Sequence, residues 1–141
     1  SPNSRLDTIH AAMLLVKLKY LDDWIRSRRE NAAYYRLHLA DVVKVPSDDR
    51  GMYSAYHTFI IKAKKRSELK AYLDQKNIDA KIHYPTPIHL QKAARYLGYQ
   101  PGDFPVAEEQ AKRILSLPVY PGLREDQLEY VVSSIRDFYG K

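Results

Sequence analysis

The sequence predicts a single α+β domain, with a long N-terminal helix followed by a small, mostly antiparallel sheet that has helices packed on one side. A stretch of good helix formers without glycine or proline runs from Leu6 to about Leu39. Four short extended segments follow this stretch, and a helical segment follows each of the last three. The length of 141 residues allows one domain and hardly two, and it suffices for a core without disulfide bonds.

The N-terminal stretch is apolar around much of its first half. The apolar residues form two faces, which are Leu6-Ile9-Met13-Val16-Tyr20 and Ala11-Leu14-Leu18-Leu21-Ile25. Such a helix is buried or packed on two sides. We therefore expect one long helix, straight or bent, over residues 1–40 as a spine between two bodies, and an α+β body over residues 41–141.

Four segments of the body have strand character. Val42–Val45 predicts a short strand closed by Pro46, and Tyr56–Ile61 is rich in β-branched and aromatic residues. Apolar and polar residues alternate over Ile78–Tyr84, which predicts a half-buried strand that the following prolines stop. Leu115–Val119 predicts a last, short extended segment.

Three further helices are expected between and after these strands. Ser67 is a suitable N-cap for a helix that carries Leu69, Tyr72 and Leu73. Pro105 suits a helix start, and that helix is expected to run to about Ile114. Apolar residues at helical spacing mark a terminal helix, namely Leu128, Val131, Val132, Ile135 and Phe138.

Composition excludes several classes of protein. Hydrophobic residues make up 45% and charged residues 28%, which is typical of a globular domain and not of a disordered one. The absence of cysteine excludes disulfide frameworks, thiolate zinc sites and cysteine nucleophiles, and it favours a reducing, cytoplasmic location. No apolar run approaches the roughly 20 residues that span a bilayer, so no membrane partner is expected. Because the chain starts at Ser1 and enters a helical pattern almost at once, we expect it to be a piece of a longer protein.

The net charge of +6 suits a partner that bears phosphate, nucleic acid included. The densest basic clusters are Arg26–Arg29 and Lys62–Arg66. Neither contains the stacking aromatic residues of a single-strand binder. We interpret both clusters as solvated faces, and no nucleic-acid partner is expected.

The richest cluster of chemically active side chains is His83-Tyr84-Pro85-Thr86-Pro87-Ile88-His89. It displays two imidazoles and a phenol on a proline-stiffened turn at a strand end, where function often concentrates. A turn whose polar side chains satisfy backbone groups explains the same residues equally well. The two histidines have no third ligand at a useful spacing, so no metal site is expected. Glycine-rich phosphate loops, HExxH and GxSxG are all absent, which argues against a self-contained nucleotide-binding enzyme.

A second polar cluster, Asn3-Ser4-Arg5-Leu6-Asp7, precedes the first helix. The Asn3 amide and the Arg5 guanidinium suit an anion at a helix start. Capping of the helix by Asn3 or Ser4 is the alternative, and spacing alone favours it.

Four motifs together resemble a known family. They are Asn3–Asp7 followed by Ala11-Ala12-Met13-Leu14, then His83–Gln91 (HYPTPIHLQ), Gly102–Glu108 (GDFPVAE) and Leu115–Pro121 (LSLPVYP). Their order and content resemble the C-terminal part of the DegT/DnrJ/EryC1/StrS family of pyridoxal-phosphate-dependent sugar aminotransferases. The chain departs from the family pattern at Ser1, where the family usually has glycine.

The resemblance implies the small C-terminal domain of a fold-type I aminotransferase that binds pyridoxal 5'-phosphate. It implies a homodimer with shared active sites, in which Asn3 reaches the cofactor phosphate of the other subunit and Arg5 orders the same loop or meets substrate. His83, Tyr84 and His89 then line the sugar-nucleotide cleft, with His89 as the expected substrate contact.

The implied reaction converts a keto sugar nucleotide to an amino sugar, with glutamate as the usual amino donor. The lysine that forms the Schiff base lies in the family's large domain, before Ser1, so this chain holds no catalytic residue and is expected to be inactive alone. Two alternatives stay open. Some relatives carry histidine in place of that lysine and act as dehydratases, and a standalone basic binding module is a reading of a different class.

Overall fold

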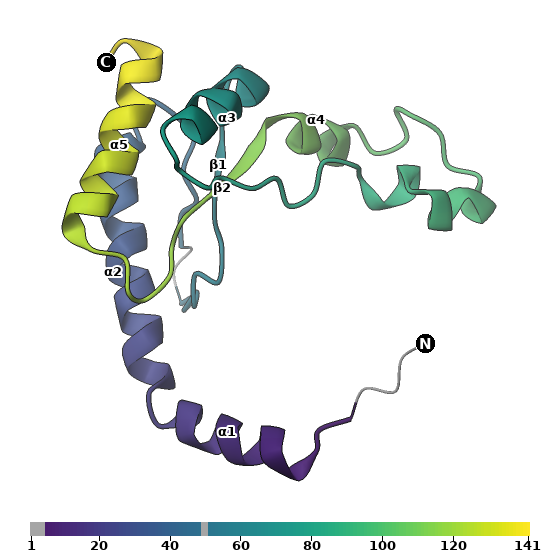
Figure 1. Ribbon diagram of the computed structural model, residues 1–141. Helices are drawn as coiled ribbons and strands as arrows, with labels where there is room; N and C mark the ends of the chain where they lie inside the picture. Colours follow the sequence, from purple (N-terminus) through teal and green to yellow (C-terminus); the bar gives the residue numbers. More distant parts are fainter. Residues whose placement is uncertain (1–4, 49–50) are drawn as a thin grey trace.

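The computed structural model describes residues 5–48 and 51–141, and it consists of helices around a small central sheet (Figure 1). In chain order the elements are α1 (Thr8–Leu18), α2 (Leu21–Leu39), β1 (Phe59–Lys62), α3 (Arg66–Gln75), the 3₁₀ helices η1 (Ile88–Leu90) and η2 (Lys92–Leu97), α4 (Pro105–Arg113), β2 (Ile114–Leu117) and α5 (Glu125–Tyr139). This order and the small antiparallel sheet agree with the expected α+β domain.

The expected single N-terminal helix is two helices. Helix α1 ends at Leu18, and α2 leaves it at a sharp angle (Figure 1). The backbone N–H groups of Lys19 and Tyr20 donate to carbonyls three residues earlier, which tightens the last turn, and Tyr20 leaves the helical conformation at φ −108° and ψ 1°. Neither glycine nor proline marks this break, so the helical pattern of the sequence continues across it.

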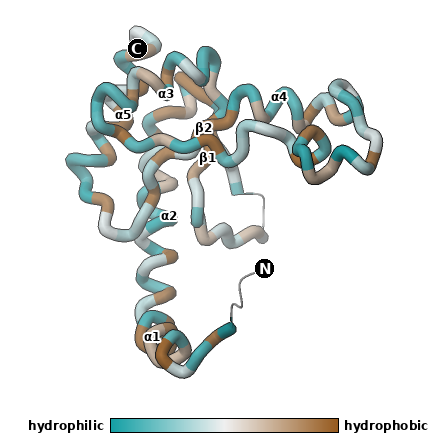
Figure 2. Tube along the Cα trace, turned by 45° about the vertical axis from the view of Figure 1, so that its right-hand side comes forward, coloured by the Kyte–Doolittle hydropathy of each residue, from teal (hydrophilic) through white to brown (hydrophobic). Residues whose placement is uncertain are grey.

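The apolar faces of α1 are not covered by the described part of the chain. No residue of α1 is buried, and Ile9 and Leu15 are 74% and 65% exposed. Figure 2 shows this helix as a strongly hydrophobic segment that extends away from the body. The described residues therefore do not supply the expected packing on two sides, which stays a prediction for a second body outside them.

The sheet is built on one regular pair of strands. Strands β1 and β2 are antiparallel, with Phe59 opposite Leu117 and Ile61 opposite Leu115. All four of these side chains are buried, because alternate residues of a strand face the same side.

Two of the expected strands contribute only isolated bridges to this sheet. Lys44 bridges to Lys62 at the free edge of β1, and Lys81 bridges to Ser116 at the free edge of β2. The four expected extended segments therefore lie in one row, but Val42–Val45 and Ile78–Tyr84 are not strands. Proline at positions 46 and 85 ends each segment soon after its bridge.

The core lies between the buried face of the sheet and helices α2, α3 and α5. Helices α2 and α5 run side by side (Figure 1). The ring of Tyr35 on α2 lies 5.2 Å from the ring of Phe59 on β1, and both side chains are fully buried. The Tyr35 hydroxyl donates to the carbonyl of Pro118 at 2.9 Å, so this buried polar group is satisfied.

The three later helices lie close to their predicted positions. Helix α4 begins at Pro105 as predicted, and α5 includes the predicted apolar residues. Helix α3 begins one residue before the predicted cap: Lys65, at φ 52°, occupies the N-cap position, and Ser67 lies inside the helix. The expectation that Ser67 caps this helix is wrong.

Candidate functional site

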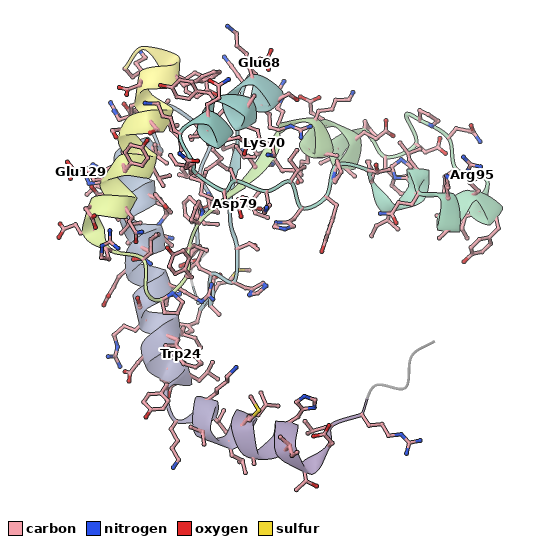
Figure 3. The ribbon with its side chains drawn as sticks, viewed as in Figure 1. Trp24, Glu68, Lys70, Asp79, Arg95 and Glu129 are labelled. Atoms are coloured by element: carbon pink, nitrogen blue, oxygen red, sulfur yellow. The ribbon has the colours of Figure 1, made fainter. Side chains whose placement is uncertain are left out.

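The cluster of histidines lies on an arm, residues 82–113, that projects from the body beside the sheet. The arm contains η1, η2 and α4, and Figure 1 shows it extending sideways from β2. Pro85 and Pro87 keep the outgoing segment out of the sheet ladder, and α4 returns the chain to β2. Arg95 stands near the outer end of the arm, far along it from the core (Figure 3).

A cavity of about 510 Å³ lies within the arm, between the proline turn and α4. Its lining is mostly apolar and aromatic and includes Tyr84, Ile88, His89, Tyr99 and Phe104. A concave, largely apolar site with a few polar groups is the usual form of a small-molecule pocket. The sequence-predicted residues Tyr84 and His89 therefore do line one cavity.

His83 connects this turn to the sheet. Its Nδ1 atom lies 2.9 Å from the hydroxyl of Ser116, a buried residue of β2. The neighbouring Tyr84 is largely exposed, and its ring meets the edge of the His83 ring with centroids 5.6 Å apart. His83 is thus held by the scaffold, while the phenol of Tyr84 is accessible to a ligand.

His89 is the most enclosed of the predicted residues. Its side chain is 8% exposed, and its Nε2 atom lies 3.1 Å from Oε1 of Glu108 on α4. The same oxygen accepts a hydrogen bond from the backbone N–H of Gly102 at 2.7 Å. This N–H, and to a smaller extent His89, holds the pKa of Glu108 below its ordinary value.

Sequence reasoning assigned no role to Glu108. The residue was visible only as the last position of the GDFPVAE motif. One sequence signal does point to Glu108. It is an acidic residue in the first turn of a helix, a position where the helix dipole favours negative charge.

Of the two predicted cofactor residues, the structure describes only Arg5. Asn3 falls outside the described residues, and Arg5 is exposed just before α1. The N-cap of α1 is Asp7, whose carboxylate accepts the backbone N–H of His10 at 2.9 Å. The described residues thus show Arg5 as an exposed side chain just ahead of α1.

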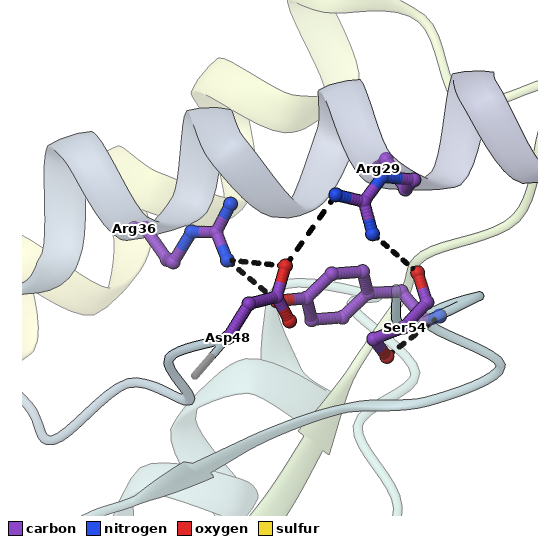
Figure 4. A network of polar contacts seen from close by, with 5 residues as sticks. Arg29, Arg36, Asp48 and Ser54 are labelled. Atoms are coloured by element: carbon purple, nitrogen blue, oxygen red, sulfur yellow. Dashed lines mark hydrogen bonds and ion pairs between the residues drawn. The ribbon is translucent and has the colours of Figure 1, made fainter. Parts of the chain in front are cut away.

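A polar network that the sequence did not reveal joins α2 to the loop before β1 (Figure 4). The Tyr56 hydroxyl donates to Asp48 at 2.6 Å and accepts from Arg36 at 2.5 Å. Arg29 donates to the carbonyl of Ser54 at 2.7 Å and lies 3.5 Å from the Asp48 carboxylate.

Within this network the pKa of Asp48 is lowered and that of Tyr56 is raised. The hydrogen bond from Tyr56 and the charges of Arg36 and Arg29 hold the pKa of Asp48 below its ordinary value. Burial raises the pKa of Tyr56. Because Arg29 binds loop atoms, the basic cluster Arg26–Arg29 is in part structural and not simply a solvated face.

No described helix is both long and apolar enough to cross a membrane. Among residues 5–48 and 51–141, no three histidine, aspartate or glutamate side chains converge on a point that could hold a metal ion.

Comparison with known proteins identifies the family. The sequence model of the DegT/DnrJ/EryC1/StrS aminotransferase family matches residues 1–136. A "Pleiotropic regulatory protein" from Geobacillus stearothermophilus is 45% identical over 97% of this chain and 38% of its own length. A dTDP-3-amino-3,6-dideoxy-alpha-D-galactopyranose transaminase from Aneurinibacillus thermoaerophilus is 38% identical over 96% of this chain and 37% of its own length.

A solved structure agrees with these relatives. The DegT DnrJ EryC1 StrS aminotransferase from Brucella abortus superposes with a TM-score of 0.92 and 44% identity, over 99% of this chain and 37% of that one. The chain therefore spans little more than a third of the length of the relatives that it matches. With a match over nearly all of its residues, the chain belongs to the DegT/DnrJ/EryC1/StrS aminotransferase family.

Proposed function

We propose that this chain is the small C-terminal domain of a pyridoxal-phosphate-dependent aminotransferase that converts a keto sugar nucleotide to an amino sugar nucleotide, with glutamate as amino donor. The observation that carries the proposal is the family match over residues 1–136. Relatives whose names state an activity support the substrate class, because they are transaminases of dTDP-linked and UDP-linked sugars.

The exposed face of α1 supports a multidomain enzyme. Leu6, Leu14, Leu18 and Trp24 line a shallow apolar groove along α1 and the start of α2. Apolar surface of this kind is stable in water only when another surface covers it. We assign that cover to the large domain that precedes this segment in its relatives, with residues 1–40 as the connecting spine and residues 41–141 as the small body.

Asn3 and Arg5 are the residues of this chain that we assign to the cofactor, across a homodimer interface. We assign the remaining phosphate ligands to the large domain and to the partner subunit. Pyridoxal 5'-phosphate, when bound, supplies the electron sink for exchange of an amine. The chain alone is expected to be inactive.

His83, Tyr84 and His89 are the residues that we assign to the sugar-nucleotide cleft. The arm cavity supports the assignment of Tyr84 and His89, which line it. His83 is not part of that lining, and it is assigned as the neighbour of Tyr84 whose ring is held by Ser116. The exposed phenol of Tyr84 and the aromatic rings of Tyr99 and Phe104 suit the ring of a sugar or a base.

Borohydride trapping on the full-length protein tests the proposal. The protein is loaded with pyridoxal 5'-phosphate and reduced, and the modified peptide is then mapped. We expect the cofactor to be trapped on a lysine upstream of Ser1. Bound cofactor without a trapped lysine would favour the dehydratase alternative, and failure to bind the cofactor would favour a standalone binding module.

A further inference from the structure

One carboxylate oxygen in the arm joins three separate segments of chain. Oε1 of Glu108 accepts the backbone N–H of Gly102 at 2.7 Å and that of Phe104 at 3.4 Å. The Nε2 atom of His89, on η1, lies 3.1 Å from the same oxygen. We call these four residues the Glu108 cluster. It ties η1 and the loop of residues 98–104 to the first turn of α4.

Two side chains of the cluster are largely enclosed, whereas Gly102 and Phe104 are exposed. The side chains of Glu108 and His89 are 16% and 8% exposed, so little water competes for the carboxylate. Hydrogen bonds to an ionised acceptor are stronger than those between neutral groups, and limited solvation strengthens them further. Removing the carboxylate would leave the exposed Gly102 N–H to water, and the loop would lose its tie to the first turn of α4.

The cluster also sets one wall of the arm cavity. The rings of His89 and Phe104 lie with centroids 4.7 Å apart, and Tyr99 meets Phe104 edge-on at 5.0 Å. All three rings line the cavity, whereas the Glu108 side chain is not part of its lining. The positions of these rings therefore depend on a carboxylate that lies behind them.

We propose that Glu108 is a positioning residue for the substrate pocket, which holds His89 and the Phe104 segment so that the aromatic wall is formed before a sugar nucleotide binds. This inference rests on the function proposed above. It makes His89 and Glu108 one unit, because the Nε2 atom of His89 is engaged by Glu108. Glu108 acts on the ligand only through that wall.

Binding measurements on the full-length protein test the inference. The variants are Glu108→Ala, Glu108→Gln, His89→Ala and the double alanine variant, and the probes are dTDP-glucose, UDP-glucose and GDP-mannose in calorimetry. We expect Glu108→Ala to weaken binding of the best probe about tenfold, because the wall loses its fixed position. Affinity for pyridoxal 5'-phosphate should stay unchanged, which a general loss of folding would not allow.

Non-additivity is the decisive result. If His89 acts as one unit with Glu108, the double alanine variant should bind the sugar nucleotide as tightly as whichever single alanine variant has the lower affinity. Glu108→Gln keeps an acceptor oxygen for Gly102 and should recover part of the affinity. The matched control is Glu109→Ala, which removes the next carboxylate, an exposed partner of Arg113. Additive losses, or equal effects of Glu108→Ala and Glu109→Ala, would overturn the inference.

Hydrogen exchange separates this inference from the proposed function. In Glu108→Ala the amides of Gly102 and Phe104 should exchange faster with or without a probe, since their acceptor is gone. Unchanged exchange would overturn the inference even if sugar nucleotides bind. If the wild-type protein binds none of the probes, the proposed function fails, and with it the role of Glu108 toward substrate. The exchange result would then report only on the loop.

Discussion

Tyr56 shows how much of the loop before β1 depends on one phenol. It is buried, yet its hydroxyl both donates to Asp48 and accepts from Arg36. We expect Tyr56→Phe to lower the free energy of unfolding by about 1–2 kcal/mol, because two charged partners lose a buried hydrogen-bonding group. Urea denaturation measures the change. Tyr53→Phe is the matched control. It also removes a tyrosine hydroxyl, but Tyr53 is exposed, and the phenylalanine retains the aromatic ring over which Arg29 lies. Equal effects of the two variants would contradict this reading of the network.

Asp48 makes the same network sensitive to acid. Its pKa lies below the ordinary value of 3.8, chiefly because the Tyr56 hydroxyl donates to it. A carboxyl with a lowered pKa stabilises the fold above its unfolded-state pKa, and this stabilisation is lost as the pH falls through the folded-state value. The difference in unfolding free energy between wild type and Asp48→Asn should be constant above about pH 5 and shrink below pH 3.8. A difference that persists unchanged at lower pH would exclude this role for Asp48.

At the scale of single residues, the sequence predicted the segment that lines the cavity but not the side chains that this segment contacts. The cluster from His83 to His89 was singled out, and the structure places Tyr84 and His89 on one cavity. No partner was predicted for Glu108 or Asp48, because Glu108 pairs with His89 across two 3₁₀ helices and a loop, and Asp48 pairs with Tyr56 across an irregular loop. Pairings of this kind depend on the fold of the loops, which local spacing does not encode.

Among the elements, helices with a clear apolar period were predictable. Helices α3 and α5 lie within a few residues of their predicted positions, because one face of each packs on the core. Helix α4 begins at Pro105, the residue from which its start was predicted. The break between α1 and α2 was not predictable, because Tyr20 is a residue that a helix accepts. The strands at the two edges reduce to single bridges, since edge segments are held by tertiary contacts more than by their own pattern.

Helix α1 offers a direct test of the domain assignment. In the full-length protein Leu15→Glu should lower the free energy of unfolding by about 2 kcal/mol or more, because a leucine that the large domain covers would be replaced by a charge. Lys19→Glu is the control, since Lys19 directly follows α1, also gains a carboxylate and does not line the apolar groove. Thermal or urea unfolding of both variants measures the effect. If Leu15→Glu is no more harmful than Lys19→Glu, the face is not covered in the full-length protein.

The whole chain has a well-packed centre and two extensions. The centre is the sheet with α2, α3 and α5, while α1 and the arm project from it with much exposed apolar surface (Figure 1, Figure 2). The relatives are nearly three times as long as the matched segment, so this shape is consistent with a small domain whose extensions meet other parts of an enzyme. Local patterns in the sequence predicted the fold class and the two apolar faces of the first helix, but they did not predict that the arm projects from the body.

Transfer of labelled nitrogen tests the proposed enzyme most directly. The full-length protein is incubated with pyridoxal 5'-phosphate, ¹⁵N-glutamate and dTDP-, UDP- or GDP-linked keto hexoses, and the nucleotide sugars are analysed by mass spectrometry. We expect one class of keto sugar nucleotide to gain ¹⁵N as an amine while glutamate is converted to 2-oxoglutarate. Loss of water from the sugar without incorporation of ¹⁵N, or no change in any sugar nucleotide, would contradict assignment of this chain to a nucleotide-sugar aminotransferase.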